Sequence, residues 1–137
     1  MGVLTVRKLN STDYDEILVK WWQDWKWTAP VKDFLPESGE GGVIIFDGDI
    51  PICAGFMYIT NSKVAWVDWI ISNKEYKNKP IRKEALDLLL SSLTKFCKDT
   101  GNKYAYALIK NQSLIKKYKD LGYTQGDSYT TEMIKLL

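Results

Sequence analysis

Apolar and polar residues follow patterns along this chain that predict a mixed α/β domain. Alternating or continuous apolar runs predict strands at residues 4–9, 43–46, 50–60, 64–72, 104–109 and 130–137. Asp47-Gly48, between the second and third runs, is typical of a β-hairpin turn. We expect these runs to form one mixed sheet, in which the strongly apolar stretch 64–72 is the central strand.

Helical periodicity and end signals predict three helices. The first follows a cluster of N-cap residues at 10–13, where Asp13 and Glu16 have capping-box spacing, and it ends before Pro30. The other two run from about Pro80 to Thr100 and from Ser113 to Leu121, and a glycine follows each of them. Residues 28–42 contain two prolines and three glycines, which predicts a loop or a broken helix. The helix at 80–100 connects the strands at 64–72 and 104–109, which should therefore run parallel.

Composition narrows the class of protein. The 137 residues are 45% apolar and 13% aromatic, enough for one core, and they contain no repeat or linker, so we expect a single domain over residues 1–137. A formal net charge of +2 disfavours a nucleic-acid-binding protein. The chain has no histidine, which excludes histidine-based triads and the usual zinc sites, and its two cysteines, Cys53 and Cys97, lack metal-ligand spacing. Without a membrane-length apolar run or a signal segment, a soluble cytoplasmic protein without a metal is expected.

Two segments carry candidate chemistry. The loop before the long helix concentrates positive charge, with five basic residues (Lys74, Lys77, Lys79, Arg82 and Lys83) and one acid (Glu75). A basic loop that leads into a helix N-terminus suits phosphate, although such a run is also compatible with a solvated turn. Further along, Asn111 is placed to cap the short helix, with Ser113 as the alternative. Tyr118 on that helix can donate a phenolic proton to a leaving thiolate, or else it is a packing residue.

Three stretches resemble the GCN5-related N-acetyltransferase (GNAT) family over nearly the whole chain. Residues 6–13 are similar to the family's first strand and helix cap, residues 46–56 to its hairpin, and Tyr118-Lys-Asp-Leu-Gly-Tyr123 to its terminal signature. The resemblance implies a single-domain acyl-CoA N-acyltransferase fold and transfer of acetyl from acetyl-coenzyme A (acetyl-CoA) to a primary amine of a small molecule or protein. The tryptophan-rich first helix, a tryptophan in the strand at 64–72 and the altered loop at 77–82 together also resemble small GNAT-like proteins of bacteriophages.

The phosphate loop departs from the family pattern Gln/Arg-x-x-Gly-x-Gly/Ala. Here the matching residues read Lys77-Asn-Lys-Pro-Ile-Arg82, so the basic first position is kept and both small positions are replaced. Pro80 has no N–H to offer a phosphate, whereas the Arg82 guanidinium is itself able to bind one. Either side-chain charge holds coenzyme A, or the chain is a non-catalytic GNAT-shaped binding module that acts on a protein partner.

The resemblance also implies residue roles. Asp68, among tryptophans, would be the general base and Tyr118 the general acid; Asp68 is equally compatible with an exposed ion-paired residue, and Glu75 is the fallback base. Trp27, Phe34 and Trp66 would contact the acceptor amine, while Trp21, Trp22 and Trp25 are first of all core residues. The expected cofactor-binding residues are Ile70, Ile71, Ser72, Lys77, Asn78, Lys79, Ile81, Arg82, Lys83, Asn111 and Tyr118. The oligomeric state is expected to be a monomer or a homodimer.

Overall fold

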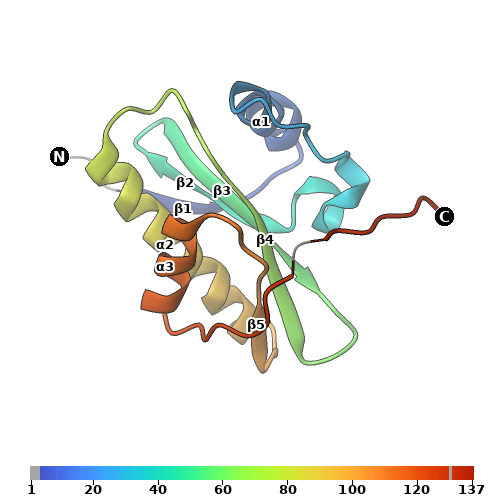
Figure 1. The fold of residues 1–137 in the computed structure, drawn as a ribbon. Helices are drawn as coiled ribbons and strands as arrows, with labels where there is room; N and C mark the ends of the chain where they lie inside the picture. Colours follow the sequence, from blue (N-terminus) through green and yellow to red (C-terminus); the bar gives the residue numbers. More distant parts are fainter. Residues whose placement is uncertain (1–3, 130) are drawn as a thin grey trace.

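The computed structural model describes residues 4–129 and 131–137, and in them one five-stranded sheet has the order β1-β2-β3-β4-β5. The first four strands pair antiparallel, while β4 and β5 are parallel, as the crossover through the long helix predicts. The mixed α/β fold is thereby confirmed (Figure 1). The strands are β1 (Leu4–Lys8), β2 (Gly42–Asp47), β3 (Ile50–Ile59), β4 (Val64–Ser72) and β5 (Tyr104–Tyr106).

Helices cover both faces of the sheet. A π-helical turn (Tyr14–Leu18) continues into α1 (Val19–Asp24) on one face, and α2 (Lys79–Asp99) and α3 (Gln112–Asp120) lie on the other (Figure 1). Two 3₁₀ turns, Lys32–Phe34 and Pro36–Gly39, occupy the loop before β2. Each face has its own apolar core: Trp21 and Trp22 belong to the α1 side, and Leu89, Leu90 and Tyr118 to the α2 side.

The predicted capping box at the first helix is wrong, because Asp13 is used elsewhere. Its carboxylate, in a residue only 2% exposed, accepts both Arg7 guanidinium nitrogens at 2.9 and 3.0 Å and the Asn10 N–H at 2.7 Å. Asn10 in turn accepts the Thr12 N–H at 3.1 Å. Asp13 still stands at the N-cap position, but its side chain makes no cap bond; the helix start is fixed instead by a charged pair that ties it to β1.

Three expectations about the sheet need correction. The stretch 64–72 is the fourth strand, and β3 is the central one. The strand predicted at 104–109 pairs only over Tyr104–Tyr106, because β4 turns away beyond that point. Residues 131–137 form no strand; Thr130 lies outside the described residues. Strand formation needs a neighbouring edge with which to pair, and an alternating pattern does not supply one.

A β-bulge bends β4 in its second half. The register with β3 shifts between the pairs Phe56↔Asp68 and Ala54↔Ile71, and Trp69 has a left-handed φ of 57°. Gly55 lies opposite the bulge, where a Cβ would come within 2.6 Å of the Ile70 Cδ1 atom. The Asp68 carboxylate accepts the Trp69 N–H at 2.7 Å, which holds the bulged backbone in place.

Candidate functional site

The most distinctive feature of the sheet is the free edge of β4. This strand pairs with β5 only over Val64–Trp66, which leaves residues 67–72, about 20 Å of strand, without a partner on that side within the described chain. The Asn73 N–H donates to the Ile52 carbonyl on β3 at 2.7 Å. Backbone groups alternate sides along a strand, so those of Ser72 point away from β3, toward the free edge. By the same alternation, the backbone groups of Ile71, which pairs with Ala54, point toward β3; its side chain is buried, so neither its backbone nor its side chain is available at the free edge.

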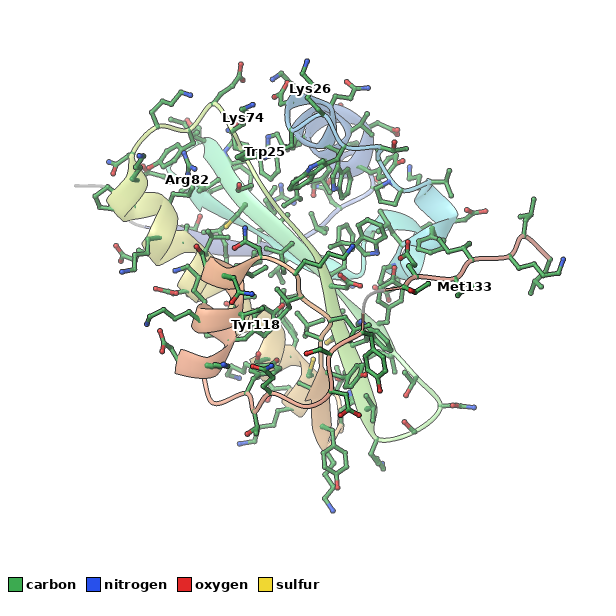
Figure 2. All side chains as sticks on the ribbon, viewed as in Figure 1. Trp25, Lys26, Lys74, Arg82, Tyr118 and Met133 are labelled. Atoms are coloured by element: carbon green, nitrogen blue, oxygen red, sulfur yellow. The ribbon has the colours of Figure 1, made fainter. Side chains whose placement is uncertain are left out.

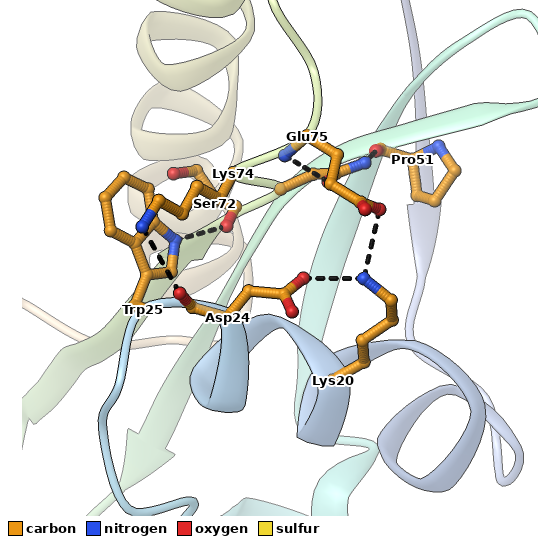
Figure 3. Close-up of polar contacts among 8 residues, drawn as sticks. Lys20, Asp24, Trp25, Pro51, Ser72, Lys74 and Glu75 are labelled. Carbon is orange, nitrogen blue, oxygen red and sulfur yellow. Dashed lines mark hydrogen bonds and ion pairs between the residues drawn. The ribbon is translucent and has the colours of Figure 1, made fainter.

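One backbone acceptor of the free edge is already in use. The Trp25 indole N–H donates to the Ser72 carbonyl at 2.8 Å (Figure 3). Lys74 lies 5.2 Å from the centre of the Trp25 ring, and its ammonium reaches the Asp24 carbonyl at 3.4 Å. The end of α1 is therefore attached to the strand and to the loop that follows it.

Asp68 and Tyr118 flank the free edge from opposite faces. Val67 belongs to the α2-side core, so its neighbour Asp68 points to the α1 side, whereas Tyr118 packs in the α2-side core. Burial raises the pKa of Asp68, the Trp69 N–H lowers it by less, and Glu132 in the C-terminal segment raises it further. The charge of Asp68 is among the causes that raise the Tyr118 pKa, which places the two groups within electrostatic reach.

Tyr118 is held as a protonated phenol. Its residue is 3% exposed, and its ring packs edge-on against Tyr123 at a centroid distance of 4.9 Å. Burial, above all, raises the Tyr118 pKa well above the usual tyrosine value. Among the described residues the hydroxyl has no hydrogen-bond partner, whereas that of Tyr123 bonds Thr94 at 2.8 Å. A neutral phenol with an uncommitted proton is the state that a general acid requires.

The N-terminus of α2 keeps few free amides for a phosphate. Asn78 caps the helix: its side chain accepts the Ile81 N–H at 3.2 Å and its carbonyl accepts the Arg82 N–H at 2.9 Å. Pro80 has no N–H. The backbone therefore does not form the multi-amide cradle that usually binds a phosphate at a helix start.

The basic side chains of this loop divide into two groups. Lys77, Lys79 and Lys83 are exposed at the helix start. Arg82 turns back and donates to the Tyr76 carbonyl, and its Nε is buried without a partner among the described residues. Lys74 is exposed as well, but its ammonium is directed to α1, which leaves Lys77, Lys79 and Lys83 as the lysines at the helix start itself. Their charge is able to attract an anion that the backbone does not cradle.

Aromatic residues form a wall on the α1 side of Asp68. The Trp69 indole donates to the Tyr58 hydroxyl at 2.8 Å, which donates to the Phe34 carbonyl at 2.9 Å. Phe34 and Trp69 meet edge-to-face at 6.0 Å, and on the β5 side Trp66 meets Tyr106 at 4.6 Å. The polar tips of Trp69 and Tyr58 are thus both hydrogen-bonded within the wall, which leaves its rings as apolar surface.

The predicted site residues thus fall into separate places. Asp68, Phe34 and Trp66 lie on the α1 side of β4, but Trp27, 54% exposed, stacks on Trp25 at 5.7 Å beside Ser72. Asn111 caps α3 by accepting the Leu114 N–H at 3.0 Å, and its side chain has that structural role. Sequence reasoning missed Tyr58, Trp69 and Tyr106. Tyr58 and Tyr106 each pair with Trp66, a relation that appears only in the strand registers, whereas the position of Trp69 directly after Asp68 is visible in the sequence.

Comparison with known proteins gives a likeness in structure alone. No protein-family model and no curated protein sequence matches the chain. Glucosamine-6-phosphate N-acetyltransferase from Arabidopsis thaliana superposes with a TM-score of 0.68 and 11% identity, over 97% of this chain and 99% of that one. A GNAT family acetyltransferase from Staphylococcus aureus gives 0.62 and 17%, over 98% and 100%. AAC(6′)-Iy, solved with the bisubstrate analogue CoA-S-monomethyl-acetylneamine, gives 0.65 and 12%, over 98% and 100%.

The chain has the GNAT fold. The residues that the sequence resemblance led us to expect at a coenzyme A site lie mainly in two places in this fold, the free edge of β4 and the loop before α2. Among the described residues no group of three or more potential metal ligands gathers, and none of the helices combines the length and apolarity that a membrane crossing requires. Cys53 and Cys97 are both free thiols and buried, and burial raises both pKa values.

Proposed function

We propose that the protein is an N-acetyltransferase that uses acetyl-CoA and acetylates a primary amine of a small molecule or protein. The observation that supports this most is the free β4 edge with Asp68 and Tyr118 on its two faces. Three proteins of the same fold are named acetyltransferases or solved with a coenzyme A analogue. The proposed roles are those of this chain's own residues at that edge.

The fit to coenzyme A differs along the edge. The backbone groups of Ile70 and Ser72 suit the extended amide arm of the cofactor, because an exposed strand edge pairs with extended amides. Asn78 and Ile81 bond each other, so Lys77, Lys79 and Lys83 are the groups that would hold the phosphates, by side-chain charge. Arg82 would act indirectly, by fixing the loop through the Tyr76 carbonyl.

The proton transfers follow from the states of the two catalytic candidates. Bound acetyl-CoA supplies a thioester carbonyl and a thiolate leaving group. Asp68 accepts one proton from the attacking amine nitrogen, and Tyr118 donates its phenolic proton to the departing sulfur. The N–C bond forms as the C–S bond breaks, and each residue regains its starting state by exchanging one proton with water. The products are an amide and free coenzyme A.

The acceptor site lies on the α1 side, where aromatic rings surround Asp68. Phe34, Trp66 and Trp69 make this side of Asp68 aromatic, which favours an amine carried on a flat or apolar body, and aromatic rings also attract a cation. Trp27, which stacks on Trp25, would contact the acceptor only at its periphery.

A binding module without catalysis is the second candidate function. Two observations favour it: the amides of Ile81 and Arg82 are already bonded, and the Ser72 carbonyl is occupied by Trp25. In this case a protein partner, not coenzyme A, would be the ligand.

Coenzyme A binding and acetyl transfer separate the two candidates. Coenzyme A at a hundred times its dissociation constant should raise the free energy of unfolding by about 2.7 kcal/mol. Thiol release from acetyl-CoA in the presence of a panel of aromatic, aliphatic and peptide amines then measures turnover. Thermal stability that coenzyme A leaves unchanged, together with no thiol release, would favour the binding module.

A further inference from the structure

The end of α1 has a backbone conformation that few non-glycine residues adopt. Lys26, directly after the helix, has a left-handed φ of 64°, a conformation that is unfavourable for residues with a Cβ. Its N–H bonds the Gln23 carbonyl at 2.9 Å, and the Trp27 N–H bonds the Trp22 carbonyl at 2.9 Å. Helices commonly end this way with glycine in the Lys26 position. The turn places the rings of Trp25 and Trp27 in a stack with an interplanar angle of 19°.

This turn directs the Trp25 indole at the free edge of β4. The indole donates its only N–H to the Ser72 carbonyl, a group that the described part of the sheet leaves without a strand partner. Figure 2 shows Trp25 and Lys74 together between α1 and the loop after β4, away from Tyr118. A strained backbone that persists where side chains fix it is a common property of segments that act in binding.

Weak surface contacts hold the same turn to the loop. Lys20 bridges the Asp24 carboxylate at 2.6 Å and the Glu75 carboxylate at 3.0 Å, and its side chain is 54% exposed (Figure 3). Such exposed pairs contribute little each. The attachment therefore rests mainly on Trp25, through its indole hydrogen bond, its cation–π contact with Lys74 and the packing of its half-buried ring against the α1-side core.

We propose that the α1 end is a latch on the free edge of β4, in which the Trp25 indole occupies the Ser72 carbonyl that coenzyme A must pair with. The inference rests on the proposed function. A ligand that needs the open state binds with an affinity reduced by the fraction of molecules that are open. Coenzyme A therefore binds only after the indole leaves, and any acceptor that draws the turn away from β4 promotes cofactor binding.

Replacing the indole hydrogen-bond donor tests the latch. Trp25→Phe keeps a ring between Lys74 and Trp27 but removes the N–H. Calorimetry with coenzyme A should show affinity about two- to tenfold tighter than in the native protein, which is the range for the loss of one neutral hydrogen bond that opposes binding. Gln23→Ala is the matched control: it changes an exposed residue of the same helix end, keeps the Trp25–Ser72 bond and should leave the affinity unchanged.

A second measurement uses the native protein, in case Trp25→Phe does not fold. By NMR, the Trp25 indole proton should exchange slowly with water in the free protein and lose that protection when coenzyme A is bound. Unchanged or weaker affinity in Trp25→Phe, or an indole proton that stays protected in the complex, overturns the latch while leaving coenzyme A binding intact. If native protein and both variants all fail to bind coenzyme A, the proposed function fails and the latch fails with it.

Discussion

The two ends of the free β4 edge are built by different means. At the Asp68 end, the half-buried Asp68 carboxylate is fixed by the Trp69 N–H, and the buried Tyr118 phenol is fixed by packing against Tyr123. At the Lys77 end, several exposed lysines surround a helix start whose Ile81 and Arg82 amides are already bonded. Electrostatic interactions are strong where water is excluded and weak where it is not. Single substitutions should therefore have large effects at the first end and small, salt-dependent effects at the second.

Tyr118→Phe should have the largest effect. The substitution removes one hydroxyl and keeps the ring against Tyr123, so stability and coenzyme A affinity should barely change. Turnover should fall by about 10²–10⁴, the usual range for a positioned proton donor. Thiol-release kinetics on a confirmed amine measure it. Tyr123→Phe, which removes the neighbouring hydroxyl bonded to Thr94, is the control and should retain most activity. Equal turnover in native protein and Tyr118→Phe would make Tyr118 a packing residue.

Asp68→Asn should lower turnover by about a hundredfold near neutral pH. The asparagine side chain still accepts the Trp69 N–H, so the bulge should persist. Because burial raises the Asp68 pKa, the native carboxylate protonates as pH falls toward that pKa, and its activity should fall with it. As pH rises, free amine becomes abundant and the defect of the variant should shrink. A pH profile of kcat/KM with the same defect at every pH would contradict a base role.

The sequence predicted those features of the fold and of the candidate site that depend on neighbouring residues. Local signals predicted β4 at its observed bounds, the parallel β4–β5 pair and the Asn111 cap, because periodicity, crossover geometry and cap residues act within a few residues. The basic loop and Tyr118 were found as candidate site residues from local patterns of the same kind.

Contacts between distant segments could not be predicted from the pattern. Trp25 and Ser72 are 47 residues apart, and nothing in the helical spacing of Trp25 indicates that its N–H leaves the core for a strand edge. The spacing of Asp13 and Glu16 predicted a capping box, but it carries no information about Arg7, the actual partner of Asp13, which lies on β1. Residues 131–137 have strand-like composition, but pairing depends on an available edge, which composition does not encode.

Gly55→Ala should test whether the geometry of the bulge matters at the Asp68 end. The added Cβ would meet Ile70 Cδ1 at 2.6 Å and Leu93 Cδ1 at 2.8 Å, so side chains must move. Overpacking of this kind lowers the free energy of unfolding by about 1–3 kcal/mol, which denaturant unfolding measures. Gly126→Ala is the control, because its Cβ would have no atom within 4 Å. Equal stability of the two variants would show that the contacts around the bulge relax freely.

Lys77→Ala and Lys79→Ala, each made singly, should have the smallest effects. Both side chains are exposed, and an exposed charge pair contributes about 0.2–1 kcal/mol, so coenzyme A affinity should weaken by at most about fivefold per lysine. Salt screens such charges, with a Debye length of about 10 Å at 0.1 M, so the difference from the native protein should shrink as salt is added. Lys98→Ala is the control, since Lys98 lies on the same helix about 28 Å from Lys79. Calorimetry at two salt concentrations is the measurement. A loss far above fivefold that persists at high salt would mean that these lysines are desolvated on binding, and the phosphate end would then resemble the Asp68 end.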